Sequence, residues 1–517
     1  MLNTHRAILT ASFLTLIAAG MGFAIRTKVL ADWGALFGFT KTDLGQITGG
    51  GFVGFGVVIL ISSLFIDRVG YKPVLVIAFL LHVLSAVVTV AATPVFDAFG
   101  KGATYQCLYW GMFLFAVANG LCEAVINPLV ADLSPGQKTH YLNILHAGWP
   151  GGMIVGGVLA YFFAGPGARA VHLSWEIPIT LFLIPTLIYG FVIIKEKFPV
   201  SEARAAGVTF GTMLWEFTSP VLLLLLLLHA MVGYVELGTD SWITNIMDNV
   251  IAEKAILLFV YMSGLMFVLR FFAGPIVEKI NPLGLLFASS ILGCIGLIWL
   301  GYSTAGLGIF LAATTYGVGK TFLWPTMLAV VGERFPKGGA LTMGAIGGMG
   351  ALSAGLLGTP GIGYKQDYYA AQNLQERSSS TYDRYVSEDK KSFLFFPSIA
   401  GLDARKVATL DDKGADIHKS IKALQDEEED LGDDKKLAKL FAWWQTAKEY
   451  QEPDKEPVED AGIFGGRMAL RWTALVPFSM AIGYLILILY FRSKGGYTAE
   501  SLINDAQRPP AEGNEGS

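Results

Sequence analysis

Three polar side chains follow one another at helical spacing inside a long apolar stretch of the sequence. Asn119, Glu123 and Asn127 lie four residues apart in "ANGLCEAVINP", and residues four apart on a helix share one face. A carboxylate in apolar surroundings can take up and release a proton, and amides form hydrogen bonds with hydroxyl groups. The pattern therefore indicates a site that binds a small polar solute and exchanges a proton at Glu123.

A second stripe at matching positions carries the opposite charge. An offset of 197 residues leads from the first stripe to Tyr316, Lys320 and Trp324. A charge at bilayer depth costs at least about 2.5 kcal/mol on insertion scales, so it faces protein or water. We expect Glu123 and Lys320 to line one central cavity, with Tyr316 and Trp324 on the same face as Lys320. The alternatives for Lys320 are a buried ion pair or a side chain that reaches the membrane surface.

Other polar residues interrupt neighbouring apolar stretches. Asn143 and His146 lie nearly on one face in "YLNILHAGWPGG" and could contact the same solute. His229 could relay protons, or it could be a structural histidine held by hydrogen bonds.

These residues lie in stretches that have the composition of membrane-spanning helices. Of the 517 residues, 53% are hydrophobic and 15% are charged, against about 25% charged in soluble domains. Twelve stretches, centred near residues 18, 54, 84, 118, 153, 184, 228, 264, 292, 320, 350 and 480, approach the about 20 apolar residues that a span needs. We predict an all-α polytopic membrane protein with twelve transmembrane helices in two pseudo-symmetric six-helix bundles.

Several classes of function find no support in the sequence. It contains no phosphate-binding "GxxxxGK[ST]" loop and no nucleophile–base set within the spans, so we expect no ATP-driven transport and no enzyme. Cys107, Cys122 and Cys294 lie in apolar runs without metal-ligand spacing, so we expect no metal, no cofactor and no disulfide. A net charge of −4 gives no reason to expect nucleic acid as a partner.

The distribution of Lys and Arg predicts the orientation. In the short loops, twelve fall on one side of the membrane and five on the other. The richer side is normally cytoplasmic, so we expect both termini in the cytoplasm and the chain in the cell (inner) membrane.

Similar segments recur in the two halves. Asp67–Arg68 and Glu278–Lys279 are 211 residues apart, as are Gly22 and Gly233. Repeated six-span halves are typical of secondary transporters whose substrate binds at the midplane between the halves.

The first of these loops resembles a known family signature. "SLFIDRVGYKP" is similar to the "GxxxDRxGRK" loop of the major facilitator superfamily, with Asp67, Arg68, Gly70 and Lys72 in place. The resemblance implies that Asp67, Arg68, Glu278 and Lys279 form a cytoplasmic gate latch, with which we expect Arg270 to pair. Arg26 lies near the outer end of its span, and Glu236, with Asp240 four residues on, lies at a nearly matching position in the second half. Arg26 and Glu236, with Asp240, could form an outer gate pair, belong to the solute site, or anchor the chain at the membrane surface.

A narrower resemblance covers about 40 residues. Glu123, Asn127, Pro128, Leu142 and Asn143 match the fucose–proton symporter family, which carries a helix 4 glutamate before "NP" and a helix 5 that begins with "LN". The resemblance implies that Glu123 takes part in proton coupling and sugar recognition. The family's helix 1 carboxylate has no counterpart in "LTASFLTLIAAGMGFAI".

These features define the expected domains. They are an N-terminal bundle (1–195), a cytoplasmic linker (196–217), a C-terminal bundle (218–360 and 466–493), a periplasmic insert (361–465) and a disordered cytoplasmic tail (494–517). Within the insert, apolar residues at helical spacing from Ile417 to Trp444 predict a hairpin of two amphipathic helices. We predict that "EPDKEPVEDAG" is a solvated linker that returns to the membrane. The insert could be a lid, bind a protein partner that the sequence does not identify, or be a simple surface insertion.

The function expected from these observations is secondary active transport of a small polar solute, a sugar moved together with a proton across the lipid bilayer. One alternative is an organic anion bound by Lys320. Another is a sensor or receptor that binds a solute on the same scaffold without transporting it.

Overall fold

The computed structural model describes residues 2–37, 39, 44, 46–48, 51–164, 170–171, 173–251, 255–303, 306–388, 390, 392–426 and 435–502. Most of these residues are helical, and the described part of the chain contains only one isolated β-bridge, between Val386 and Leu402. The acidic stretch 427–434 and the tail residues 503–517 lie outside the described residues.

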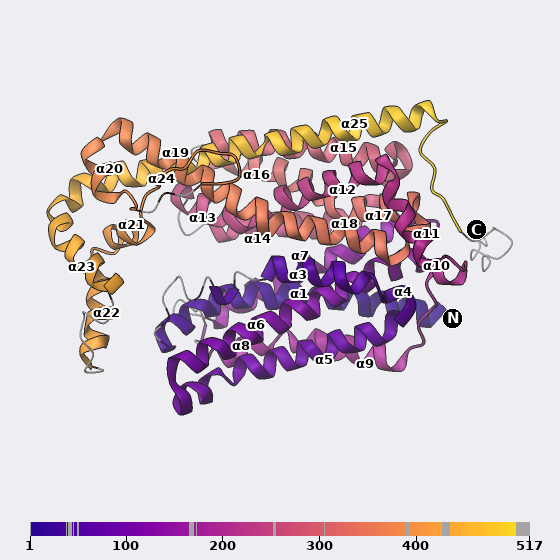
Figure 1. Cartoon of the computed structure of the whole chain (residues 1–517), viewed down its shortest axis with the longest axis horizontal. Helices are drawn as coiled ribbons and strands as arrows, with labels where there is room; N and C mark the ends of the chain where they lie inside the picture. The colour runs from indigo at the N-terminus through magenta and orange to yellow at the C-terminus, as the bar shows by residue number, and fades with distance from the viewer. Residues whose placement is uncertain are drawn as a thin grey trace.

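The helices form two groups and an insert (Figure 1). The first group contains α1 (Leu2–Phe37), α3 (Gly51–Ser63), α4 (Ile66–Val69), α5 (Tyr71–Val90), α6 (Ala92–Leu133), α7 (Lys138–Phe163), α8 (Glu176–Thr180) and α9 (Leu183–Lys195). The linker carries α10 (Glu202–Ala205), α11 (Phe210–Trp215) and η1 (Glu216–Thr218). The second group contains α12 (Pro220–Gly233), η2 (Tyr234–Gly238), α13 (Thr239–Ile251), α14 (Ala255–Arg270), α15 (Ala273–Tyr302), α16 (Gly306–Thr321), α17 (Leu323–Arg334), η4 (Pro336–Gly338), α18 (Gly339–Ser353), η5 (Ala354–Gly358) and α25 (Leu475–Ser493).

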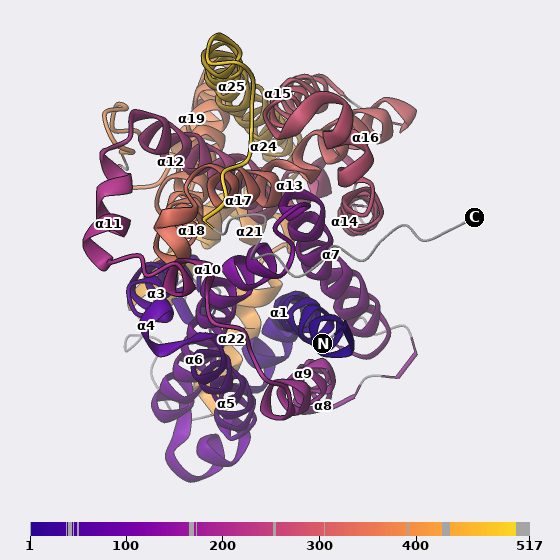
Figure 2. The ribbon, with the colours of Figure 1, turned by 90° about the vertical axis from the view of Figure 1, so that its right-hand side faces the viewer.

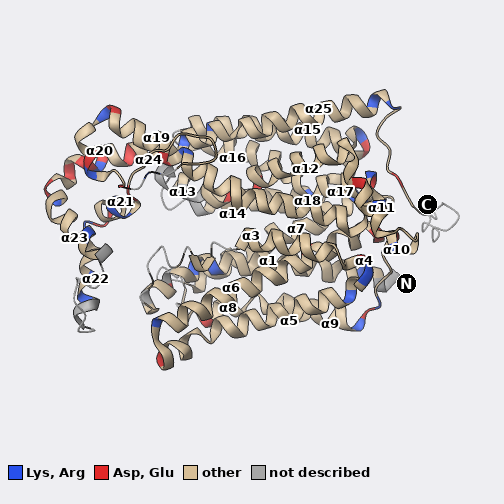
Figure 3. Ribbon diagram, viewed as in Figure 1, with Lys and Arg blue, Asp and Glu red and all other residues tan. Residues whose placement is uncertain are grey.

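The helices have the length and composition of membrane spans. Within the described residues, nine helices are long and apolar enough to cross a membrane, and Leu257–Arg270 is a shorter apolar helix. Charged residues lie mainly toward the two ends of the helix groups and in the insert, while the middle parts of the helices carry few (Figure 3). Each of the twelve predicted centres lies on a helix. However, α7 and the α16–α17 pair are not among the nine apolar helices; both are rich in buried glycine and polar residues.

The two groups repeat the same local geometry. Gly70 and Asn281, which are 211 residues apart, both adopt a positive φ, 95° and 54°, at the turn that follows the predicted latch residues. Gly152 in α7 lies against the backbone of Ile17 in α1, and Gly233 in α12 lies against the backbone of Gly350 in α18. The pairing of α1 with α7 in the first group therefore recurs as the pairing of α12 with α18 in the second.

The insert continues two spans beyond the bundle. It is built from α19 (Thr359–Arg377), α20 (Ser379–Tyr385), α21 (Ala404–Asp411), α22 (Ala415–Asp426), α23 (Lys435–Ala447), η6 (Lys448–Tyr450) and α24 (Gln451–Thr473). The predicted hairpin is present as α22 and α23, where Ile417 and Trp444 are buried together. The predicted solvated linker is wrong because these residues form α24: Asp454 is buried and bonds to Thr381 and Arg384, while Val458 packs on Leu374.

The two ends of the bundle differ. α1 begins and α25 ends at the same end, called the terminal end below, and the insert projects from the opposite end, the insert end (Figures 1 and 2). The linker helices α10 and α11 also lie at the terminal end. The predicted disorder of the tail is wrong for residues 494–502, which are held in place by hydrogen bonds described below.

Candidate functional site

The predicted carboxylate lies in a polar cluster between α6 and α7. Asn127 Nδ2 donates to Glu123 Oε2 at 2.8 Å, and Asn127 Oδ1 lies 2.9 Å from His146 Nε2. His146 Nε2 is also 3.9 Å from Glu123 Oε2. All three side chains are at least nine-tenths buried. The structure therefore brings together three residues predicted from two different stretches, with the amide of Asn127 hydrogen-bonded to both the carboxylate and the imidazole.

Arg270 connects this cluster to the second group of helices. Its NH1 donates to the carbonyl of His146 at 2.6 Å, and its NH2 donates to Glu236 Oε1 at 3.0 Å. Its Nε donates to the carbonyl of Thr321, and the side chain is 2% exposed. The expectation that Arg270 pairs with the gate latch is wrong. Because α14 ends at Arg270 beside the break between α16 and α17, the guanidinium points into the bundle instead.

The second predicted charge has a partner from its own half. Lys320 forms a buried ion pair with Asp240, and its Nζ lies 5.4 Å from the centre of the Tyr316 ring. The nearest acid to Lys320 is thus Asp240 and not Glu123, so the buried ion pair, considered as an alternative above, is what the structure contains.

The expected outer-gate pair of Arg26 with Glu236 is also wrong. Arg26 is 2% exposed and its Cζ lies 3.6 Å from the centre of the Phe115 ring and 4.8 Å from that of Phe182. Ring faces attract a cation, and Glu236 is bound to Arg270 instead. Glu236 and Asp240 lie in and just after the π-helical turn η2, inside the bundle rather than at its outer end.

Four other predicted residues are engaged in packing or in bonds to neighbours. Asn119 Oδ1 is 2.9 Å from His82 Nε2, in the interior of the first group. The Tyr316 hydroxyl donates to the carbonyl of Val235 at 2.7 Å. The Trp324 ring lies 4.6 Å from that of His229, whose nitrogens have no hydrogen-bond partner among the described residues. Asn143 Nδ2 donates to Thr326 Oγ1 at 3.1 Å, which joins α7 to α17.

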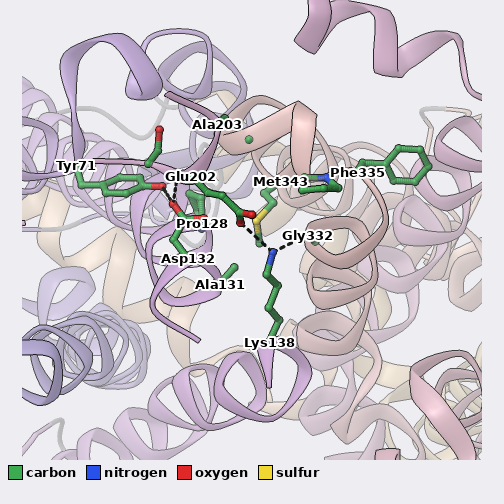
Figure 4. A pocket seen from close by; sticks show the side chains of 13 residues that line it. Tyr71, Pro128, Ala131, Asp132, Lys138, Glu202, Ala203, Gly332, Phe335 and Met343 are labelled. Atoms are coloured by element: carbon green, nitrogen blue, oxygen red, sulfur yellow. Dashed lines mark hydrogen bonds and ion pairs between the residues drawn. The ribbon is translucent and has the colours of Figure 1, made fainter. Parts of the chain in front are cut away.

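A seal closes the two groups together at the terminal end. Lys138 Nζ at the start of α7 donates to the carbonyl of Gly332 at 3.0 Å and lies 3.4 Å from Glu202 Oε2 (Figure 4). Thr139 Oγ1 donates to Glu333 Oε1 at 2.8 Å. A small pocket of about 20 Å³ lies here, lined by Tyr71, Asp132, Lys138 and Glu202 among others.

The two predicted latch loops differ. Asp67 is buried in the seal and accepts a hydrogen bond from the backbone N–H of Ala340 at 3.1 Å, and burial raises the pKa of this carboxyl. Arg68 is exposed and its carbonyl accepts from Arg204. Glu278 and Lys279 are exposed, and Glu278 acts electrostatically on His140 near the start of α7, so the latch role of this loop stays a prediction. Near them, the backbone N–H of Gly274 donates to His140 Nδ1 at 3.2 Å.

The comparison with known families decides the assignment. The sequence model of the Major Facilitator Superfamily matches residues 6–359. The chain belongs to the Major Facilitator Superfamily. It is a multi-pass membrane transporter of that family, as the latch loop and the two repeated halves predict.

Solved structures share this fold at low sequence identity. FucP, the E. coli fucose:proton symporter, in its outward conformation aligns with a TM-score of 0.58 and 16% identity over 71% of this chain and 93% of its own. The proton:xylose symporter XylE gives 0.61 and 15% over 72% and 91%. An inward-facing bacterial homologue of the human lysosomal transporter Spinster gives 0.61 and 14% over 96% and 99%. No curated protein matches the sequence.

The seal of this superfamily member uses residues that sequence reasoning missed. The tail returns to the seal, where the Tyr497 hydroxyl donates to Glu333 Oε2 at 2.7 Å and Leu502 N–H donates to Glu202 Oε1 at 3.0 Å. Glu202 and Glu333 each also contact the start of α7. A sequence signal was available: Glu333 ends the apolar run of α17, and Glu202 follows the last span of the first group, so both acids lie where an apolar stretch has ended.

Proposed function

We propose that this transporter moves a small neutral polar solute, a sugar, together with a proton, and that Glu123 carries the proton. The observation that carries the proposal is the buried Glu123–Asn127–His146 cluster, joined through Arg270 to Glu236 in the other half. The side chain that hydrogen-bonds the Glu123 carboxylate is the neutral amide of Asn127, and the Arg270 guanidinium acts on that carboxylate electrostatically without pairing with it.

The pairing of the central cations supports a neutral solute over an anion. Lys320 is bound to Asp240 and Arg270 to Glu236, so each cation already has a carboxylate. An anionic solute bound at Lys320 or Arg270 would have to displace the acid of that pair, which would then lie buried and uncompensated. A neutral polyol can instead bond to amide, imidazole and carboxylate groups without disturbing either pair.

Closure at the terminal end supports alternating access. Hydrogen bonds between the two groups run from Asp67 at the terminal end up to His146. By the positive-inside distribution of Lys and Arg, we take this end as cytoplasmic, with both termini inside an inner membrane. The cycle then consists of binding from outside, protonation of Glu123, opening of the seal, and release of solute and proton to the cytoplasm.

The test measures external pH when members of a sugar panel are added to de-energised cells that express the chain. Proton symport predicts alkalinisation with one class of sugar, abolished by Glu123→Gln. Asp97→Asn, at an exposed carboxylate on the outer part of α6, is the matched control and should behave like the wild type.

Two other results would replace the proposal. Uptake of labelled sugar without any pH change, unaltered in Glu123→Gln, would remove proton coupling from Glu123. Saturable binding of a solute to purified protein without accumulation in proteoliposomes would favour a sensor. Sugar acids in the same panel test the organic-anion alternative, which requires loss of uptake in Lys320→Met together with no response to neutral sugars.

A further inference from the structure

One loop of the insert exposes large apolar side chains. In residues 392–397, between α20 and α21, Phe395 is 85% exposed, Leu394 is 64% exposed and Phe396 is 42% exposed. Leu394 adopts a φ of 50°, which is unusual for a residue other than glycine. The rings of Phe395 and Phe396 stack at 4.8 Å. Three adjacent exposed apolar residues on a folded loop indicate a contact surface.

The loop is fixed to the first part of α19 rather than to the outer part of the insert. The Tyr364 hydroxyl donates to the carbonyl of Pro397 at 2.7 Å. The Tyr364 ring lies 6.2 Å from that of Phe393 and 5.8 Å from that of Phe396. Gly361 lies so close to Phe393 that an added Cβ would be 2.9 Å from its ring.

The height of these contacts along the bundle places the loop at membrane level. Further out on α19, Tyr369 stacks with Trp472 at 6.5 Å, and Trp472 is 46% exposed, as expected of a ring in the interfacial belt. Tyr364 lies five residues before Tyr369, which at 1.5 Å per residue is about 7 Å further into the bundle. At a similar depth beyond Trp472, α25 exposes Leu475 and Phe478, whose neighbours in a membrane are lipid tails.

From this geometry we propose that residues 393–396 insert into the lipid bilayer at the insert end and anchor the insert to the membrane surface. The occupant of the apolar patch is lipid, because the patch continues the aromatic belt formed by Tyr364, Tyr369 and Trp472. The insert is thereby held against the second group of helices while the two groups move relative to each other.

The test measures the environment of a spin label in proteoliposomes of phosphatidylethanolamine and phosphatidylglycerol. Phe395→Cys and, as a second variant, Leu394→Cys are labelled in a background in which Cys107, Cys122 and Cys294 are replaced. Leu485→Cys on the exposed face of α25 is the lipid reference, and Lys419→Cys on exposed α22 is the water reference. Collision rates are measured with oxygen, which concentrates in lipid, and with a water-soluble nickel chelate.

Insertion predicts that both loop labels collide with oxygen as often as the Leu485 label does and lose most of the nickel collisions seen at Lys419. A loop label with the nickel accessibility of Lys419 would place the patch in water and overturn the proposal. Low accessibility to both reagents would also overturn it, because the patch would then be covered by protein, such as a second copy of the chain.

Discussion

At the residue scale, the centre of the transporter is organised around two carboxylates on one span. Glu236 and Asp240 are four residues apart and bind Arg270 and Lys320, which come from α14 and α16. A buried ion pair adds little net stability, but removing one partner leaves an uncompensated charge in a low dielectric. The two pairs therefore fix the position of the span formed by α12, η2 and α13 against its neighbours more than they stabilise the fold.

This argument predicts the effect of breaking one pair. Arg270→Gln should lower the free energy of unfolding by about 3–5 kcal/mol, because Glu236 then remains buried without its partner. Arg270→Gln combined with Glu236→Gln should recover part of that loss. Thermal unfolding followed by size-exclusion chromatography in detergent measures both variants.

A control pair lies in the insert. Arg377 and Asp460 form an exposed ion pair, and Arg377→Gln should cost at most about 1 kcal/mol. If the double variant at Arg270 and Glu236 proves as unstable as the single one, the bonds from Arg270 to the two carbonyls, and not the charge pair, hold this region.

The same residues define how far the sequence could predict the site. The four-residue spacing correctly placed Glu123 and Asn127 together, and the neighbouring stretch supplied His146. The partner of Lys320 was not predictable, because the π-helical turn η2 adds a residue to the turn before Asp240. The extra residue changes the direction in which the side chains after η2 point from the helix axis. Arg26 was also misassigned, since no pattern in the sequence shows that two phenylalanines distant along the chain will enclose it.

At the element scale, pairs of helices approach closely where glycine removes the side chain. A Cβ at Gly152 would lie 2.3 Å from the carbonyl oxygen of Ile17, and one at Gly233 would lie 1.9 Å from that of Gly350. Small residues at such contacts let helix backbones pack directly in the membrane. The pair α1 and α7 is therefore packed into one unit that can move as a rigid body, and the pair α12 and α18 into another.

A matched pair of glycines on α7 tests this packing. Gly152→Ala should markedly destabilise the protein, because the backbone of α1 must shift to admit the methyl group. Gly157→Ala adds the same methyl group to the same helix at a position with nothing within 4 Å, and should be neutral or slightly stabilising, since alanine favours helix. Equal melting temperatures for the two variants would show that α1 and α7 are not in contact as described.

The helices themselves were largely predictable, with one instructive failure. Each of the twelve centres that hydropathy predicted lies on a helix, although only nine helices of the described chain are long and apolar enough to be spans, and helical spacing identified α22 and α23. The segment "EPDKEPVEDAG" was taken for a linker because it is charged and contains two prolines, yet it lies within α24. Its partner is distant along the chain: Asp454 binds Arg384, and Val458 packs on Leu374. Tertiary contacts of this kind leave no local signal.

At the scale of the whole molecule, the seal combines both halves, the linker and the tail. Glu333 accepts bonds from Thr139 in the first half and from Tyr497 in the tail. Glu202 in the linker contacts Lys138 and also accepts from the N–H of Leu502. The tail residues 497–502 thus join acids that also hold the start of α7. The sequence predicted the two halves, and the Asp67 loop does bond to the second half through Ala340. It did not predict the position of the tail, whose polar composition resembles a disordered end.

The position of the tail predicts that it favours the state closed at the terminal end. A hydrogen bond to a charged group contributes about 1.5–3 kcal/mol, and the bond between Tyr497 and Glu333 exists only while the tail lies across the seal. Tyr497→Phe should therefore shift the equilibrium toward opening at this end by about tenfold or more, and truncation after Lys494 should shift it further.

Spin labels at Lys195→Cys and Lys279→Cys, exposed ends of the two halves, report the opening as a longer distance population by double electron–electron resonance. Leu485→Ala, at an exposed position of α25, is the control substitution in place of Tyr497→Phe and should leave the distances unchanged. If truncation leaves them unchanged as well, the tail rests on a seal that Lys138, Thr139 and Asp67 already hold closed by themselves.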